Sequence, residues 1–245
     1  RAGSHYVDTG ITESHAVAFA AGIARAGGTP VVATTASFFQ RAYDQFFQEM
    51  SLNRSRVTVL DFLGGLSGSD NTHSGAYDVT MFSNIPGVTM LVPTSARDYL
   101  ADLAWATAPA GSADAPAGPA VIRVPGEAIL AAERDATLLP VTGGQIAARP
   151  QSASLPASAS SASGGISAAT VRGTVSVTAQ HAGARHMLDW RVNQTGSQVA
   201  IIGLGNAYPL AEQTAAALSD DYGITATVID PRQCTSLDSD VLESL

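Results

Sequence analysis

Short apolar runs alternate with amphipathic stretches through the first half of this chain. The amphipathic stretches, at residues 13–26, 38–50 and 95–108, are long enough for helices and carry apolar side chains at helical spacing. The apolar runs are short and rich in β-branched residues, which is typical of buried strands; they are VVATTA at 31–36, VTVLDFL at 57–63, TMLVP at 89–93 and AVIRV at 120–124. This alternation predicts an α/β fold with a doubly wound, mainly parallel sheet over residues 1–126.

The alternation stops after residue 126 and resumes near residue 199. Residues 148–165 are rich in Ala, Ser and Pro and offer almost no large apolar side chain, so they cannot build a core. We therefore expect residues 127–196 to be a linker or insertion that is partly disordered, with a strand or hairpin at 171–179 added to the edge of a sheet. A strand, a helix and a second strand then predict a partial second α/β domain over 197–245, truncated before its sheet is complete.

Composition narrows the classes of function. With 245 residues and 45% hydrophobic residues the chain can bury a substantial core, and it has no apolar run long enough to cross a membrane. The net charge of −8 argues against general nucleic-acid binding. All basic residues are arginine, which excludes a Schiff-base lysine and a P-loop. The single cysteine, Cys234, excludes an internal disulfide and fits a cytoplasmic location.

The most informative stretch is residues 6–45, which contains the run GITESH followed by SFFQRAYDQ. It resembles the pyrimidine-binding domain of the thiamine-diphosphate enzymes of the transketolase superfamily, and most of all the 1-deoxy-D-xylulose-5-phosphate synthases. The resemblance implies that Glu13 hydrogen-bonds N1′ of the cofactor's aminopyrimidine. Glu13 lies in the first turn of a predicted helix with Thr12 as N-cap, where the helix dipole favours the anion and burial favours the acid, so it is suited to sharing a proton.

The same resemblance assigns further site residues. Phe38 would pack against the aminopyrimidine ring and Arg41 would face the substrate. In the glycine-rich loop at 64–78, GGLSGSDNTHSGAYD, His73 would face the substrate carbonyl and donate a hydrogen bond to the developing oxyanion. Asp70 would be the loop's substrate-binding acid, and Arg123, which ends a predicted strand, would bind the phosphate of the acceptor.

No metal ligand is expected in this chain. The superfamily's diphosphate and Mg²⁺ site contains a GDG run that the sequence lacks, so the resemblance places that site on an N-terminal domain or subunit absent from this chain. We therefore expect half an active site that is inactive alone and needs this partner, in an assembly expected to be a homodimer.

The function implied by the resemblance is a transferase that condenses pyruvate with glyceraldehyde 3-phosphate and releases CO₂. Two enzyme alternatives remain open: the C-terminal subunit of a split transketolase, and the β subunit of a 2-oxoacid dehydrogenase, which the His73–Ser74 pair mildly favours. A non-enzyme alternative is a dimerisation or regulatory fragment without catalysis.

Overall fold

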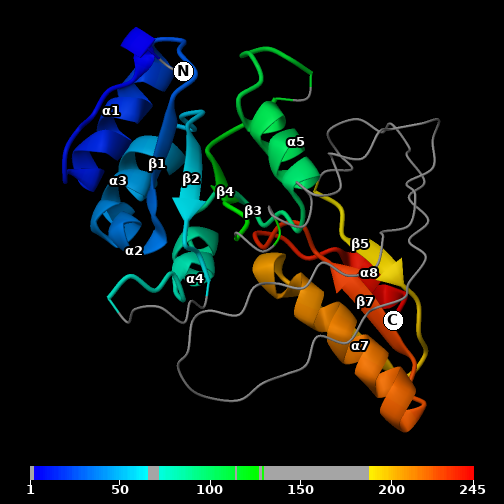
Figure 1. The fold of residues 1–245 in the computed structure, drawn as a ribbon. Helices are drawn as coiled ribbons and strands as arrows, with labels where there is room; N and C mark the ends of the chain where they lie inside the picture. The colour runs from blue at the N-terminus through cyan, green and yellow to red at the C-terminus, as the bar shows by residue number, and fades with distance from the viewer. Residues whose placement is uncertain (1–2, 66–71, 114, 127–128, 130–187) are drawn as a thin grey trace.

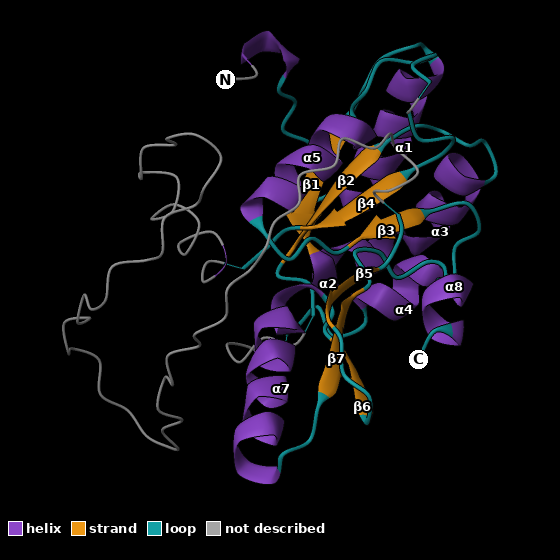
Figure 2. Ribbon diagram, turned by 90° about the vertical axis from the view of Figure 1, so that its right-hand side faces the viewer, coloured by secondary structure: helices purple, strands orange, loops and turns teal. Residues whose placement is uncertain are grey.

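The computed structural model describes residues 3–65, 72–113, 115–126, 129 and 188–245. Its first part is built on a four-stranded sheet with strand order β1-β2-β4-β3, in which every pair is parallel (Figures 1 and 2). The strands are β1 (Val31–Thr35), β2 (Thr58–Phe62), β3 (Thr89–Leu91) and β4 (Ala120–Arg123). All four were predicted within a few residues, and the predicted parallel α/β fold is confirmed.

Helices cover both faces of this first sheet, as expected for a doubly wound fold. Val59 and Val121 point to the face covered by α1 (Glu13–Arg25), the π-helical turn η3 (Phe46–Ser51) and α4 (Asp78–Ser83). The next residue along each strand, Leu60 and Ile122, points to the opposite face and packs beneath α5 (Ala96–Ala106). Figure 1 shows α1 to α3 grouped on one side and α5 on the other. Alternation along each strand thus supplies both halves of the core.

The single helix predicted over residues 38–50 is wrong in detail. The segment divides into α2 (Ala36–Phe39), a 3₁₀ turn η2 (Gln40–Ala42), α3 (Tyr43–Gln45) and η3. The hydroxyl of Ser14 donates a hydrogen bond to the carbonyl oxygen of Arg41 at 2.6 Å. A side chain bonded to a helical carbonyl competes with the regular i to i−4 ladder, and this contact lies in the 3₁₀ turn between α2 and α3.

The first helix begins at the predicted residue but without the predicted cap. Thr12 occupies the N-cap position of α1, yet its side chain makes no capping hydrogen bond. Its hydroxyl instead donates to the carbonyl oxygen of Thr9 at 2.6 Å. The hydroxyl therefore stabilises the preceding turn and leaves the amide groups at the start of α1 without a side-chain cap from this residue.

The second part contains a three-stranded sheet with order β5-β7-β6. Its described elements are β5 (Arg191–Gln194), β6 (Val199–Ile202), the 3₁₀ turn η5 (Gly205–Ala207), α7 (Tyr208–Tyr222), β7 (Ala226–Asp230) and α8 (Ser239–Glu243). Strands β6 and β7 are parallel and were predicted. Strand β5 pairs antiparallel with β7 and was not predicted, because its sequence RVNQ is polar and mostly exposed and carries no apolar pattern.

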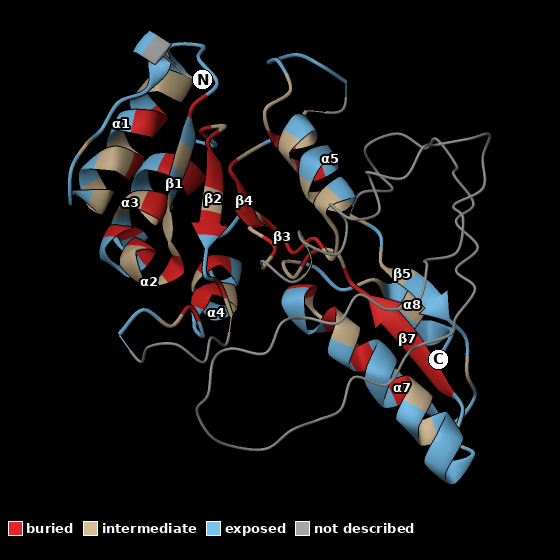
Figure 3. Ribbon diagram, viewed as in Figure 1, coloured by how far each residue is buried: buried red, intermediate tan, exposed pale blue. Residues whose placement is uncertain are grey.

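The two parts are joined through the outer edge of the first sheet. The backbone amide of Val92 donates to the carbonyl oxygen of Arg232 at 2.7 Å, and that of Cys234 donates to Met90 at 3.1 Å. Leu91 and Gln233 form an antiparallel bridge between these bonds. The chain that follows β7 therefore extends the first sheet beside β3, and Figure 3 shows buried residues continuing from β3 and β4 into β7.

Two expectations lie outside the described residues. The Ala- and Ser-rich stretch at 148–165 and the edge strand expected at 171–179 both fall within residues 130–187. The domain limits that we expected from the sequence, 1–126, 127–196 and 197–245, stay predictions, although β5 belongs structurally to the second sheet.

Candidate active site

Glu13 is the first residue of α1, and its side chain is 10% exposed. The residues before it form a turn in which Gly10 takes a positive φ of 68°, a conformation that favours glycine. Oε2 of Glu13 lies 3.6 Å from Nη1 of Arg41, whose side chain is 63% exposed. A shielded carboxyl group at a helix start is thus placed beside an exposed guanidinium group.

The turn that follows Phe38 is tied to the start of α1. Ser14, next to Glu13, donates to the carbonyl oxygen of Arg41, as described above. Phe38 lies in α2, three residues before Arg41. The structure therefore brings the Glu13 and Arg41 side chains together on adjoining elements, with Phe38 one helical turn away.

Phe38 also contacts the predicted catalytic histidine. The rings of Phe38 and His73 meet edge-on, with centroids 5.3 Å apart and planes inclined by 67°. The hydroxyl of Thr72 and Nδ1 of His73 are 2.8 Å apart and share a hydrogen bond. The His73 side chain is exposed and Phe38 is half-buried. The imidazole therefore meets the Phe38 ring edge-on and is exposed.

Arg123 ends β4 and is buried. Its Nε donates to Oδ2 of Asp78 at 2.7 Å, and its Nη2 donates to Oδ1 at 2.5 Å. This two-point ion pair leaves Nη1 as the nitrogen not used by Asp78. The predicted contact of Arg123 with a phosphate stays a prediction, and Asp70 lies outside the described residues.

Sequence reasoning missed two buried acids at this site. Asp61, near the end of β2, and Asp78, at the start of α4, are 0% and 1% exposed. Burial, and then the neighbouring Asp78, raise the pKa of Asp61 to about 9, although the charge of Arg123 acts in the opposite direction. The available signal was the polar residue that interrupts the apolar run VTVLDFL, because a carboxyl group on a buried strand needs a partner.

A second cluster of charges lies where the two sheets meet. Nη2 of Arg191 is 2.9 Å from Oδ2 of Asp98 and 3.2 Å from Oδ2 of Asp230, and the hydroxyl of Thr94 donates to the same Asp230 oxygen at 2.9 Å. Burial opposes ionisation of Asp98, but the charge of Arg191 and its hydrogen bond hold the pKa of Asp98 below its usual value. Burial raises the pKa of nearby Asp102 to about 7. These contacts fasten α5 to β5 and β7.

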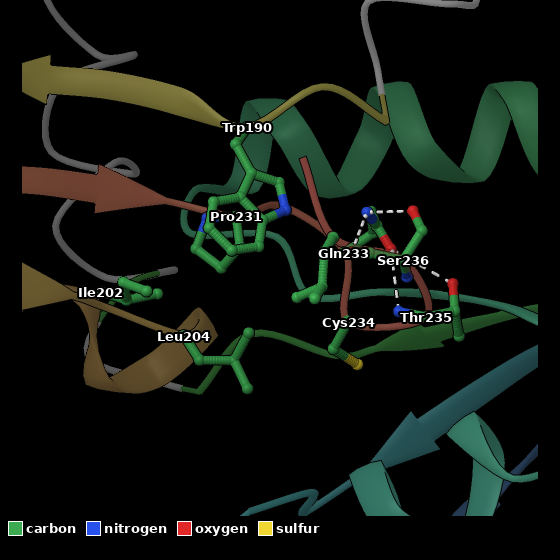
Figure 4. A pocket seen from close by; sticks show the side chains of 9 residues that line it. Trp190, Ile202, Leu204, Pro231, Gln233, Cys234, Thr235 and Ser236 are labelled. Carbon is green, nitrogen blue, oxygen red and sulfur yellow. Dashed lines mark hydrogen bonds between the residues drawn. The ribbon is translucent and has the colours of Figure 1, made fainter. Parts of the chain in front are cut away.

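A cavity of about 310 Å³ lies on the second part of the chain and includes none of the predicted site residues (Figure 4). Figure 4 shows Gln233 turned toward Ser236, to which its Nε2 donates at 2.7 Å. The residues that line the cavity are mostly apolar: Trp190, Ile202, Leu204, Pro231, Gln233, Cys234, Thr235, Ser236 and Leu237.

No group of three or more His, Cys, Asp or Glu side chains in the described ranges could hold a metal ion. No helix in the same ranges is long and apolar enough to cross a membrane.

The sequence matches two family models. The family described as "Transketolase, pyrimidine binding domain" matches residues 2–125, and the family described as "Transketolase, C-terminal domain" matches residues 188–245. The second match begins just before β5, so it includes the strand that sequence reasoning missed.

Among curated proteins, the chain is 30% identical over 237 residues to a 1-deoxy-D-xylulose-5-phosphate synthase of Symbiobacterium thermophilum, covering 97% of this chain and 28% of the relative. A protein of the same name from Oleidesulfovibrio alaskensis is 42% identical over 121 residues, covering 49% of this chain and 18% of the relative. The chain thus spans less than a third of the length of these relatives.

Among solved structures, a "Split gene transketolase, inactive beta4 tetramer" aligns with a TM-score of 0.62 and 19% identity, covering 97% of this chain and 60% of that chain. A transketolase of Pichia stipitis aligns with a TM-score of 0.62 and 14% identity, covering 95% of this chain and 28% of that chain. At these identities the likeness shows a shared fold.

Proposed function

Because the chain belongs to the transketolase family, we propose that it forms the pyrimidine-binding part of a thiamine-diphosphate-dependent 1-deoxy-D-xylulose-5-phosphate synthase. The proposed reaction condenses pyruvate with glyceraldehyde 3-phosphate and releases CO₂. The observation that carries the proposal is the placement of Glu13, a shielded carboxyl group at the first residue of α1 beside the turn that bears Phe38.

The donor set around Glu13 fits an aminopyrimidine ring. Arg41 is the ion-pair partner of Glu13 among the described residues, and a 3.6 Å contact leaves the carboxyl group able to share a proton with a ring nitrogen. The hydroxyls of Thr35 and Ser37, just before Phe38 in the chain, are buried and have no hydrogen-bond partner among the described residues. A polar ring bound beside Phe38 would offer such groups the partners that buried polar atoms require.

Thiamine diphosphate, when bound, supplies a nucleophilic ring carbon that attacks the carbonyl group of a 2-oxo acid. Glu13 would hold the proton shared with N1′, and Phe38 would pack against the ring and exclude water. His73, edge-on to Phe38, would donate a hydrogen bond to the oxygen of the substrate carbonyl. Arg41 would attract the anionic substrate through its exposed guanidinium group. The roles of Asp70 and Arg123 in binding substrate belong to the same proposal.

The remaining half of the site would come from a partner. We propose that an N-terminal domain, in the same polypeptide or in a separate subunit, binds the diphosphate through Mg²⁺, and that the complete enzyme is a cytoplasmic homodimer. A compact, highly charged diphosphate–Mg²⁺ group needs several fixed oxygen ligands, and in this proposal the partner domain supplies them. On this view the chain alone is inactive.

One observation favours a second candidate. A split-gene transketolase chain aligns over 97% of this chain, so a separate transketolase subunit of this shape has a solved counterpart. The two candidates differ in the donor: a synthase turns over pyruvate with release of CO₂, whereas a transketolase takes a two-carbon unit from a ketose. Donor competition in the complete enzyme distinguishes them.

The experiment that tests the shared mechanism is Glu13→Gln in the complete enzyme. We expect turnover to fall by about 10²–10⁴, because removal of an acid–base group typically has this effect, while the circular dichroism spectrum stays unchanged. Glu49→Gln, at an exposed glutamate of the same part, is the matched control and should retain wild-type turnover. Activity of the Glu13 variant within about tenfold of wild type would overturn the assignment.

A further inference from the structure

A buried pair of acids lies beside Gly64 and Gly75, which precede and follow His73 in the glycine-rich loop. Asp61 comes from β2 and Asp78 from α4, and both are buried with Arg123 from β4. Strands β2 and β4 are parallel neighbours in which Asp61 and Arg123 are paired in register. The register therefore places one guanidinium group and two carboxyl groups in a single buried cluster.

The hydrogen bonds of this cluster are unequally shared. Arg123 donates to both oxygens of Asp78, at 2.7 and 2.5 Å. Both side-chain oxygens of Asp61 are buried and accept no hydrogen bond from any described residue. Two ionised carboxylates with one guanidinium group would leave a net negative charge away from water, which is strongly unfavourable. A proton kept on Asp61 would remove this excess charge, and the resulting hydroxyl could donate a hydrogen bond to Asp78.

The same cluster lies against the two stems of the loop. The first stem, before His73, is Gly64 and Gly65, and the second stem, after His73, is Gly75. The amide of Gly65 donates to the carbonyl oxygen of Gly75 at 3.0 Å, and the amide of Asp78 donates to the same oxygen at 3.1 Å. A Cβ atom on Gly64 would lie 2.3 Å from Oδ2 of Asp78 and 2.7 Å from Oδ2 of Asp61. The two carboxyl groups thus fill the space beside the first stem. The backbone amide of Asp78 also bonds the second stem at Gly75, two residues after His73.

We propose that Asp61, in its protonated form, is a positioning residue that joins the two loop stems flanking His73 by donating a hydrogen bond to Asp78. Asp78 in turn is held by Arg123, so the stem after His73 is fixed to strands β2 and β4. The effect of Asp61 on turnover rests on the proposed function, whereas the protonation of Asp61 does not.

The groups that face Asp61 determine the pH range in which Asp61 keeps its proton. Asp78 from α4 and Arg123 from β4 are paired with each other, and the thiol of Cys234 comes from the segment after β7. Burial raises the pKa of Cys234 to about 12, so the thiol stays neutral. Burial and Asp78 raise the pKa of Asp61 to about 9, so Asp61 is the group here that titrates on the alkaline side of neutrality.

The first test is Asp61→Asn in this chain, with urea unfolding measured between pH 5 and 10. An unfolded aspartate ionises near about pH 3.9, whereas folded Asp61 keeps its proton to about pH 9. The folded state then binds more protons in this window, so the wild-type midpoint should fall as the pH rises. The asparagine variant keeps a donor toward Asp78 and should lack this part of the decline. Equal pH dependence of the two proteins would overturn the protonation.

The second test measures turnover against pH in the complete enzyme. Asp61→Asn should keep kcat at alkaline pH, where wild type loses it, and Asp61→Leu, which lacks a donor, should lower kcat at every pH with little change in KM. Asp102→Asn, at the junction of the two sheets, is the control and should follow the wild-type profile. Identical alkaline profiles of wild type and Asp61→Asn would overturn the positioning role alone. A complete enzyme without thiamine-diphosphate-dependent turnover would refute the proposed function, and the unfolding data would still decide the state of Asp61.

Discussion

Replacing Asp78 with asparagine removes the carboxylate from the ion pair with Arg123. The side chains of Arg123 and Asp78 are 8% and 0% exposed, and two hydrogen bonds join them. Breaking a buried pair by removing one partner typically destabilises a protein by about 3–5 kcal/mol, because the other charge is left without compensation. A protein domain has only about 5–15 kcal/mol of stability in total. The variant should therefore be folded but much less stable.

Asp61 determines where in the range of about 3–5 kcal/mol the loss of stability in Asp78→Asn falls. When Asp78 no longer carries a charge, Asp61 can release its proton and form an ion pair with Arg123 across the strand pair. We therefore expect Asp78→Asn to lie near the lower end, about 3 kcal/mol. The double variant Asp61→Asn/Asp78→Asn leaves Arg123 without a carboxylate in this cluster. It should lose more than the sum of the single variants, by about 0.5–3 kcal/mol.

The assay is urea unfolding at pH 7, monitored by far-ultraviolet circular dichroism. It compares wild type with Asp61→Asn, Asp78→Asn and the double variant. Asp98→Asn is the matched control, because Arg191 is 40% exposed and keeps Asp230 at 3.2 Å. We expect that variant to lose about 1 kcal/mol or less. A loss below about 1 kcal/mol for Asp78→Asn would refute the buried ion pair. Strict additivity in the double variant would refute the ionisation of Asp61 and its pairing with Arg123 in the Asp78→Asn variant.

Two further predictions concern the chain on its own. Because burial raises the pKa of Cys234 to about 12, iodoacetamide at pH 8 should alkylate this thiol far more slowly than it alkylates glutathione. Alkylation of Cys234 should become fast in denaturant. Rapid labelling of the folded chain would contradict this prediction. Calorimetric titration with thiamine diphosphate and Mg²⁺ should show no binding tighter than about micromolar, since binding must offset roughly 4–15 kcal/mol of lost freedom without the diphosphate ligands. Sub-micromolar affinity would place the diphosphate site within these 245 residues.

Much of the first sheet was predictable because its signal is local. Each strand and helix that packs on a core repeats apolar residues at its own period, and that period is visible without knowledge of the partner. The position of Glu13 at the start of α1 follows from the same local pattern, and it was predicted correctly. Strand β5 was not predictable in this way. Its stability comes from backbone pairing with β7, which leaves no apolar pattern in its sequence.

The segment at 38–50 is also contacted by a distant residue where its helix is interrupted. Ser14 and Arg41 are 27 positions apart, and their hydrogen bond exists only because α1 packs beside that segment. No propensity of the segment itself carries this information, so sequence reasoning predicted one continuous helix.

The buried acids show the same division most clearly. The sequence by itself determined that Asp61 lies in an apolar strand and that Arg123 ends another, since both statements concern neighbours along the chain. Only the tertiary structure decided that Arg123 is bound by Asp78, 45 positions earlier, and that Asp61 lies beside them without accepting a hydrogen bond from any described residue. The physical reason is that the protonation and pairing of a buried group depend on the charges around it in space, which the strand register and the packing of α4 bring together.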